Sequence, residues 1–208
     1  MLENVKQAVV NCKLKQIQGL VQEALDAGAA PNDVLNAMSE AMADVGEKFQ
    51  RNEVFVPEML VSAKTMKKGV EVLRPLLGGS EVGKYGKFVI GTVSGDLHDI
   101  GKNLVAMMVE SAGFEVIDLG TDVSAEKFVE TVKANPDCKV VGLSSLLTTT
   151  MDAMRQTVKA LGDAGLRDQV KIMVGGAPIT QAFCDEIGAD AYTADAASAA
   201  AKAKELAQ

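Results

Sequence analysis

The sequence has no tryptophan, a single histidine and only three cysteines among its 208 residues, and aromatic residues make up 4% of the chain. The cysteines, Cys12, Cys138 and Cys184, lie far apart, so they form neither a Cys-x-x-Cys pair nor a dense disulfide framework. No apolar run approaches the roughly 20 residues that a membrane span requires. The N-terminal residues lack the basic-then-apolar layout of a signal peptide. These absences predict a cytoplasmic protein with reduced thiols and no membrane partner.

Positive charge is also scarce: 21 Lys and Arg residues face 28 Asp and Glu residues, for a formal net charge of -7. An acidic surface repels phosphate backbones and anionic lipids, so no nucleic-acid partner is expected. One histidine and three scattered cysteines cannot readily assemble the usual ligand set of a zinc site. The 48% of hydrophobic residues is nevertheless enough for a core without metal or disulfide staples.

The first 80 residues have the apolar spacing of helices. Apolar residues recur every three or four positions over residues 10–24, 34–49 and 59–77. Pro31 and Pro57 suit the first turns of the second and third of these segments. Helices with one apolar face pack nearly antiparallel in a small bundle. Residues 1–80 are therefore predicted to form a helical-bundle domain, followed by a glycine-rich linker at residues 78–86.

From residue 87 to residue 208 the pattern changes to short apolar runs that alternate with helical segments. This alternation predicts an α/β domain with a five-stranded parallel sheet covered on both faces, a Rossmann-like (flavodoxin-like) fold. The expected strands are residues 88–93, 116–119, 139–143, 171–174 and 191–192, and the expected helices are residues 101–111, 125–133, 151–161, 180–187 and a terminal alanine-rich segment. Ligands of such folds bind at the carboxyl ends of the strands, near the point where strand order reverses.

The loop after the first expected strand contains the only histidine, His98, with Asp96 two residues before it and Gly101 three residues after it. A lone imidazole can be the single axial ligand of a metal that a macrocycle already holds, as haem and corrin cofactors require. A carboxylate on the other ring nitrogen would set the tautomer, and Asp96 is a candidate for that position. The alternative is a surface or capping histidine.

The other loops at this edge have small side chains. Residues 144–150 carry five hydroxyls, which are alternatively helix N-caps. Residues 175–178 read Gly-Gly-Ala-Pro, which is alternatively a tight turn, and residues 194–198 are again small. Together these loops predict a deep slot for a bulky ligand beside the histidine. Neither residues 95–98 nor residues 175–176 match the Gly-x-Gly-x-x-Gly dinucleotide signature or a P-loop, so a nucleotide hydride carrier is disfavoured.

These loops resemble the cobalamin-binding domain of methionine synthase and the corrinoid proteins of methanol, methylamine and O-demethylase methyltransferase systems. The family pattern Asp-x-His-x-x-Gly stands at residues 96–101, the later Ser-x-Leu at residues 144–146, and the Gly-Gly pair at residues 175–176. The resemblance covers nearly the whole chain and includes the helical segment, which is similar to the family's cap domain.

The resemblance implies that the chain binds cobalamin or a related corrinoid such as methylcobalamin, with His98 as the axial ligand of cobalt. Asp96 and Thr150 would complete a ligand relay with His98. The implied binding residues of the α/β domain are Gly95, Asp96, Leu97, His98, Asp99, Ile100, Gly101, Ser144, Leu146, Thr148, Gly175, Gly176, Ala177, Tyr192, Ala194, Asp195 and Ala196. The implied cover of the methyl ligand is formed by Phe49, Val56 and Met59 of the cap domain.

The implied function is that of a methyl carrier that cycles between cob(I)alamin and methylcob(III)alamin. It would pass a methyl group between a substrate:corrinoid methyltransferase and a corrinoid:acceptor methyltransferase, with a reductive activator as a third partner. A chain of 208 residues has no room for donor and acceptor catalytic domains, so a subunit of a multi-component methyltransferase is expected. The alternatives are a cobalamin-dependent sensor, a subunit of an adenosylcobalamin mutase, and a flavodoxin-like domain without a corrinoid.

Overall fold

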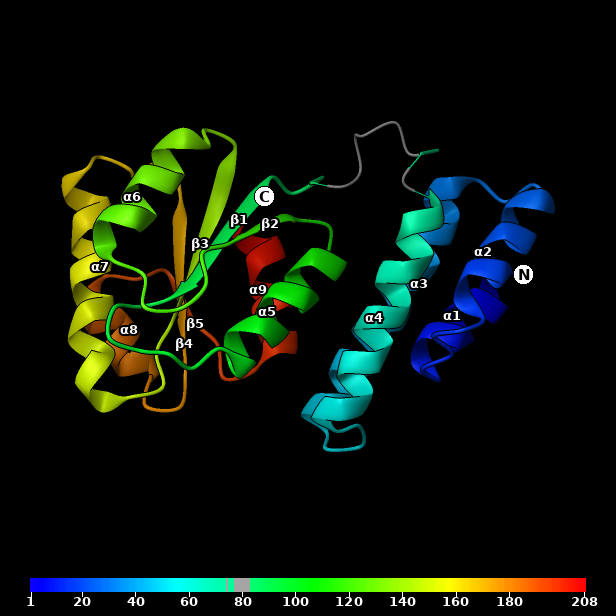
Figure 1. The fold of residues 1–208 in the computed structure, drawn as a ribbon, viewed down its shortest axis with the longest axis horizontal. Helices are drawn as coiled ribbons and strands as arrows, with labels where there is room; N and C mark the ends of the chain where they lie inside the picture. The colour runs from blue at the N-terminus through cyan, green and yellow to red at the C-terminus, as the bar shows by residue number, and fades with distance from the viewer. Residues whose placement is uncertain (74, 77–82) are drawn as a thin grey trace. The chain divides into compact units, whose positions relative to one another are not determined.

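The computed structural model describes residues 1–73, 75–76 and 83–208 (Figure 1). The chain divides into two compact units, residues 1–82 and 83–208. Of the predicted linker at residues 78–86, residues 78–82 lie outside the described residues, and residues 83–86 lead into the first strand. Among the described residues, no helix combines the length and the apolar character needed to cross a membrane.

The first unit is helical, as predicted. Helices α1 and α2 each pack against α3 and α4, and α3 packs against α4. A Cβ atom at Gly69 in α4 would lie 2.6 Å from Sδ of Met38 in α3, so glycine permits the close approach of these two helices. The unit consists of α1 (Leu2–Val10), α2 (Ile17–Asp26), α3 (Pro31–Gln50) and α4 (Val56–Leu73).

The predicted first helix, residues 10–24, is wrong in its course. Helix α1 ends at Val10, and the chain turns before α2 begins at Ile17. Within this turn Cys12 adopts φ +57°, and its Sγ lies 3.3 Å from the Ser62 hydroxyl oxygen in α4. A spacing of three and four residues continues across such a turn, so the apolar pattern does not reveal the break. The predicted third helix runs to Leu77, which lies outside the described residues; α4 ends at Leu73.

The second unit is an α/β domain with a five-stranded sheet in the order β2-β1-β3-β4-β5, and every pairing is parallel. This confirms the predicted fold class. The strands are β1 (Lys87–Thr92), β2 (Glu115–Asp118), β3 (Cys138–Ser144), β4 (Lys171–Gly175) and β5 (Ala191–Tyr192). The helices are α5 (Ile100–Ser111), α6 (Ala125–Ala134), α7 (Met151–Asp163), α8 (Gln181–Ile187) and α9 (Ala196–Leu206), with a 3-10 turn η1 (Thr148–Thr150).

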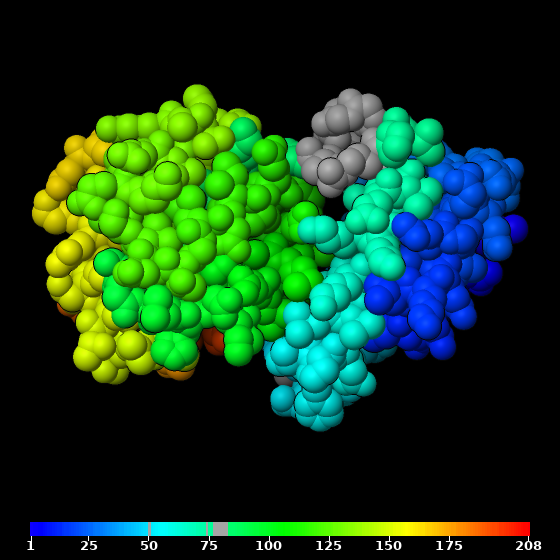
Figure 2. Space-filling view, in the orientation of Figure 1, coloured from blue at the N-terminus to red at the C-terminus, as the bar shows by residue number. Residues whose placement is uncertain are grey.

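The helices form two layers around the sheet. In Figure 1, α6, α7 and α8 cover one face and α5 and α9 cover the other, and contacts between α6 and α7 and between α5 and α9 agree with this arrangement. Figure 2 shows α6 and α7 as adjacent parts of the surface of this unit. Glycines in the central strands admit large side chains from within the unit: a Cβ at Gly91 would lie 2.7 Å from the Phe128 ring, and one at Gly142 would lie 2.9 Å from the Phe88 ring.

The strand order places the functional edge. Strand β1 has β2 on one side and β3 on the other, so the order reverses between β1 and β3. The loops that leave β1 and β3 therefore flank the topological switch point at which α/β sheets bind ligands. His98 follows β1, and residues 145–150 follow β3.

Candidate functional site

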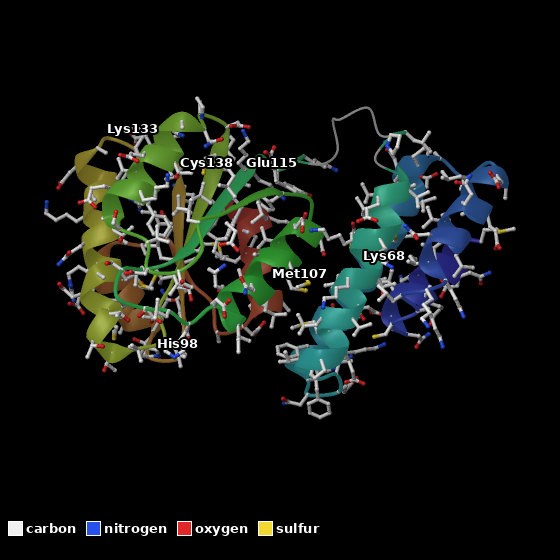
Figure 3. The ribbon with its side chains drawn as sticks, in the orientation of Figure 1. Lys68, His98, Met107, Glu115, Lys133 and Cys138 are labelled. Atoms are coloured by element: carbon white, nitrogen blue, oxygen red, sulfur yellow. The ribbon has the colours of Figure 1, made fainter. Side chains whose placement is uncertain are left out.

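The His98 side chain is oriented by its own loop. Figure 3 shows Cys138 and Glu115, the first residues of β3 and β2, toward one end of the sheet and His98 toward the other. The Nδ1 atom of His98 lies 2.7 Å from Asp96 Oδ1, and the backbone N–H of His98 donates to the same oxygen at 3.0 Å. The hydroxyl of Thr92 donates to the His98 carbonyl at 2.8 Å. The backbone and the ring of His98 are therefore both held.

This geometry sets the tautomer of a neutral imidazole. A carboxylate can only accept hydrogen bonds, so Nδ1 of His98 carries the proton that Asp96 accepts. The lone pair of Nε2 is then free for a ligand. The His98 side chain is 51% exposed, which leaves that nitrogen accessible to a group outside the chain.

Asp96 is fully buried, and its carboxylate is the centre of the site. Besides His98, it accepts the backbone N–H of Leu146 at 2.7 Å, the N–H of Leu147 at 3.3 Å and the hydroxyl of Thr150 at 3.1 Å. Burial raises the pKa of Asp96, but the hydrogen bonds from His98, Leu146 and Thr150 together outweigh it and hold the pKa well below its usual range. Asp96 is therefore ionised at neutral pH.

A buried serine extends this network beyond the predicted residues. The hydroxyl oxygens of Ser145 and Thr150 are 2.8 Å apart, and Ser145 is fully buried. Since Thr150 donates its proton to Asp96, Ser145 is the donor to Thr150, and the order is Ser145, Thr150, Asp96, His98. The sequence predicts roles for Ser144 and Leu146 but not for Ser145, the residue between them. Neighbouring residues at the end of a strand point to opposite faces of the sheet, so the alternation itself indicates that Ser144 and Ser145 have different surroundings.

Large apolar side chains are exposed around this polar centre. Leu97 is 74% exposed and Ile100 is 79% exposed in the loop after β1, and Leu146 and Leu147 are also exposed in the loop after β3. Within residues 83–208, these four are the only large hydrophobic side chains that are exposed. Apolar surface concentrated beside a free imidazole is typical of a site that a bulky ligand covers.

The Gly-Gly loop after β4 approaches the loop after β3. Gly176 has φ +134°, and a Cβ there would lie 1.7 Å from the Ser145 carbonyl oxygen. The backbone N–H of Ser145 donates to the Gly175 carbonyl at 3.1 Å. The close backbone approach expected at this pair is thus made by the chain itself at Gly176. A Cβ at Gly101 would instead meet no atom within 4 Å among the described residues outside its own helical turn and chain neighbours, so none of those residues requires glycine there.

The remaining predicted residues of this unit have varied surroundings. Asp195 caps α9 by accepting from the N–H and the hydroxyl of Ser198, at 2.8 and 2.7 Å. Tyr192 packs against the hydrophobic core and is partly buried, whereas Ala196 is buried in the first turn of α9. Ser144 is partly buried, and the exposed predicted residues are Gly95, Asp99, Thr148, Ala177 and Ala194.

The three predicted residues of the helical unit lie near the turn between α3 and α4. Phe49, in the last turn of α3, is partly buried, and Val56 begins α4 and is exposed. Met59 is fully buried, so its side chain belongs to the core of the unit in this structure. Phe55, which was not among the predicted residues, is 65% exposed in the same turn. That these side chains cover a ligand stays a prediction.

His98 is the candidate metal ligand of this site. Among residues 1–73, 75–76 and 83–208, no group of three or more His, Cys, Asp and Glu side chains is placed to hold a metal ion. Burial raises the pKa of the Cys138 thiol to about 11 and also raises the pKa of Cys184, so both thiols are neutral. The site fits a metal that arrives with its other ligands already in place.

Comparison with known proteins agrees with this geometry. A family model described as a B12 binding domain matches residues 86–203, and a second model with the same description matches residues 1–74. The chain is 42% identical over 207 residues to dimethylamine corrinoid protein 1 of Methanosarcina mazei, which covers 99% of this chain and 95% of that relative.

Two solved structures are similar along nearly the whole chain. A cobalamin-binding protein from Desulfitobacterium hafniense DCB-2 has a TM-score of 0.84 and 34% identity, covering 99% of this chain and 98% of that one. A chain of the methanol:cobalamin methyltransferase complex MtaBC from Methanosarcina barkeri has a TM-score of 0.83 and 27% identity, covering 98% of this chain and 78% of that one.

Proposed function

Because this chain belongs to the B12-binding family along both of its units, we propose that it is the corrinoid protein of a methyltransferase system and carries methyl groups between partner enzymes. The family and the cofactor, cobalamin or a related corrinoid, are those that the sequence predicts. The observation that carries the proposal is the 2.7 Å contact between Nδ1 of His98 and a buried, ionised Asp96, which leaves Nε2 free for cobalt.

The residues present fit a corrinoid. A macrocycle brings the other ligands of its metal, so the protein would need to supply only one donor, and His98 would be that donor. The exposed Leu97, Ile100, Leu146 and Leu147 offer apolar contact to a large ring. When bound, the corrinoid would supply a cobalt ion that accepts and releases the methyl group as the cobalt changes oxidation state.

The chain's own residues would tune and protect the axial donor. Asp96 would keep the Nδ1 proton on His98 and hold the imidazole so that Nε2 faces away from the carboxylate. Thr150 and Ser145 donate toward Asp96 and keep its charge solvated inside the unit.

We further propose a methylated amine as the methyl donor. The relative that is 42% identical over nearly the full length is named for dimethylamine, whereas the chain from the methanol system is 27% identical. The partners would be an amine:corrinoid methyltransferase, a corrinoid:acceptor methyltransferase and a reductive activator. Incubating the reduced, loaded protein with an amine methyltransferase and dimethylamine should produce the absorption spectrum of the methylated corrinoid, whereas a methanol methyltransferase with methanol should not.

The axial ligand can be tested with labelled histidine. Since His98 is the only histidine, growth on histidine labelled with 15N in the ring labels that imidazole alone. The protein is incubated with hydroxocobalamin, desalted and reduced to the Co(II) state. Its electron paramagnetic resonance spectrum should show the two-line coupling of 15N instead of the three lines of 14N. His98→Ala should abolish this coupling, and Asp99→Ala, a neighbouring change, should preserve it.

Two results would count against the proposal. Protein that stays colourless after desalting would exclude corrinoid binding. Coupling that keeps three lines in the 15N-histidine sample would show that the nitrogen belongs to the cofactor's own base, and His98 would then not be the axial ligand.

A further inference from the structure

A residue far from the His98 motif in sequence holds the His98 loop at two points. The carboxylate of Asp122, in the loop after β2, accepts the backbone N–H of Gly95 at 2.7 Å. The backbone N–H of Asp122 donates to the carbonyl of Asp96 at 3.0 Å. The hydroxyl of Ser94 also lies 3.5 Å from the Asp122 carboxylate. Asp122 thus accepts a hydrogen bond from the N–H of Gly95 and donates one to the carbonyl of the following residue, Asp96.

The backbone of Asp122 is in an uncommon conformation. Asp122 has φ +53° and Gly95 has φ +82°, both in the left-handed region. A residue with a side chain keeps such a conformation only where its surroundings determine it, and Asp and Asn do so more readily than most residues. The adjacent Val123 forms a parallel bridge with Val93, and its N–H donates to the Thr92 carbonyl at 3.0 Å. The two loops are therefore joined directly beside the Asp122 contacts.

These contacts control the position of Asp96. The side chain of Asp96 is held from the β3 side by Leu146 and Thr150, whereas its backbone is held from the β2 side by Asp122. A carboxylate 2.7 Å from an imidazole keeps that ring oriented only while its own backbone stays in place. We propose that Asp122 is a positioning residue for His98, acting through Gly95 and Asp96 on the orientation of the imidazole. The part of this inference that concerns cobalt ligation rests on the proposed function, whereas the part that concerns the orientation of the imidazole does not.

The far end of the same loop has a separate anchor. The ammonium of Lys102 in α5 is buried and donates to both oxygens of Asp118 at the end of β2, at 2.6 and 2.5 Å. Asn103 donates to the Asp99 carboxylate at 3.0 Å and, through its backbone N–H, to the Asp99 carbonyl at 2.7 Å. Since these contacts do not involve Asp122, the loop stays attached to the unit when the Asp122 side chain is removed.

Three variants separate the hydrogen bond from the backbone conformation. Asp122→Gly keeps the left-handed conformation without strain but has no acceptor for Gly95. Asp122→Asn keeps an acceptor oxygen and tolerates the same conformation. Asp168→Gly removes an exposed carboxylate from the turn that precedes the amino end of β4. It controls for the loss of a charge and for the added glycine. Asp122→Ser, whose hydroxyl is shorter, replaces Asp122→Gly if circular dichroism shows that the glycine variant does not fold.

The first measurement uses the protein without cofactor. With 15N-histidine, nitrogen NMR of the imidazole reports which ring nitrogen carries the proton. We expect one dominant Nδ1–H form in the unmodified protein, in Asp122→Asn and in Asp168→Gly. In Asp122→Gly the ratio of the Nδ1–H form to the other forms should fall about fivefold, the ratio that loss of one hydrogen bond produces, and hydrogen exchange of the Gly95 amide should accelerate by at least as much.

The second measurement uses the protein loaded with hydroxocobalamin and reduced to Co(II). The fraction of cobalt with 15N coupling should fall in Asp122→Gly and be retained in Asp122→Asn. The inference is overturned if Asp122→Gly leaves both the NMR spectrum and the electron paramagnetic resonance spectrum unchanged. It is also overturned if Asp122→Asn behaves like Asp122→Gly. If no variant binds a corrinoid, the proposed function fails, and the cofactor-free NMR still decides whether Asp122 positions His98.

Discussion

The two halves of the carboxyl edge of the sheet are built differently. The loops after β1 and β3 are joined by polar side chains, with Asp96 accepting hydrogen bonds from His98, Leu146 and Thr150. At Gly175, the last residue of β4, and at Gly176, the first residue after it, the chain meets the backbone of Ser145 closely. One half is held by side-chain hydrogen bonds, and the other half by close backbone contact.

Because of this difference, we expect the two halves to respond to substitution in different ways. In the polar half, a change removes a hydrogen bond or a charge, so the effect depends on pH and on the partner left behind. In the glycine half, a change adds atoms, so the effect depends on the distance to the nearest backbone atom. Four substitutions, taken from the largest expected effect to the smallest, test this distinction.

Gly176→Ala should be the most damaging. Its Cβ would lie 1.7 Å from the Ser145 carbonyl oxygen at φ +134°, so the backbone of two loops must move. We expect the free energy of unfolding to fall by about 3 kcal/mol or more. Urea unfolding followed by circular dichroism measures the loss. A loss below that of the Gly175→Ala variant would show that this half of the edge is not sterically determined.

Asp96→Asn should have the next largest effect, because it keeps the shape of the side chain but removes the charge that accepts from Leu146 and Thr150. The free energy of unfolding should fall by about 2 kcal/mol at pH 7. The folded-state pKa of Asp96 lies below its unfolded value of about 3.9, so its charge stabilises the fold above that pH and this contribution is lost as the pH falls through and below it.

Urea unfolding of the Asp96→Asn variant and the unmodified protein at pH 7, 5 and 3.5 checks this sign. The difference between the two proteins should be largest at pH 7 and should narrow at pH 3.5. Asp168→Asn, with an exposed carboxylate, should follow the pH dependence of the unmodified protein. A gap that widens toward low pH would contradict the lowered pKa of Asp96.

Thr150→Val should have a moderate effect. Valine keeps the branched shape but leaves Asp96 without one donor and Ser145 with only the Leu147 carbonyl, 3.3 Å away, as an acceptor, so the free energy of unfolding should fall by about 1–2 kcal/mol. Thr150→Ser retains the hydroxyl and should lose less than about 1 kcal/mol. Differential scanning calorimetry compares the two variants, and equal losses would show that the hydroxyl of Thr150 contributes nothing.

Gly175→Ala should have the smallest effect on stability. Its Cβ would lie 3.3 Å from the Thr193 carbonyl, a tight contact that a small shift relieves, so we expect a loss of less than about 1 kcal/mol. The added methyl group would instead narrow the space beside the loop, and uptake of hydroxocobalamin should weaken. Absorbance after desalting measures the bound corrinoid. Unchanged uptake would show that Gly175 does not line the ligand space.

Much of the α/β fold could be predicted because buried parallel strands are short apolar runs between turn residues. The ends of the five predicted strands lie within one residue of the ends of β1 to β5, and the predicted start of α7 at Met151 is the observed one. The helical unit was harder, because apolar residues spaced by three and four continue through the turn at residues 11–16. There the contact of Cys12 with Ser62 in α4, not the local pattern, accompanies the break.

The site was predicted unevenly for a similar reason. Asp96 and His98 are two residues apart, so one loop brings them together, and their contact follows from the local sequence. Ser145 and Asp122 reach the site from other loops, and a single sequence contains no signal that pairs Asp122 with Gly95. Thr92 was read only as part of a strand, although its hydroxyl holds the His98 carbonyl.

Local sequence is enough to predict the alternation of strands and helices, the single imidazole beside a carboxylate, and the small residues at the end of β4 and after it. These features follow from local spacing, since the apolar pattern of a segment and the residue types of a loop need no distant partner. The tertiary structure is needed to establish the strand order that brings the loops after β1, β2 and β3 together. It is also needed to establish the burial and ionisation of Asp96 and the hydrogen bonds by which Ser145 and Asp122 hold its surroundings. Hydrogen bonds between residues 27 to 54 positions apart exist only once the sheet has formed.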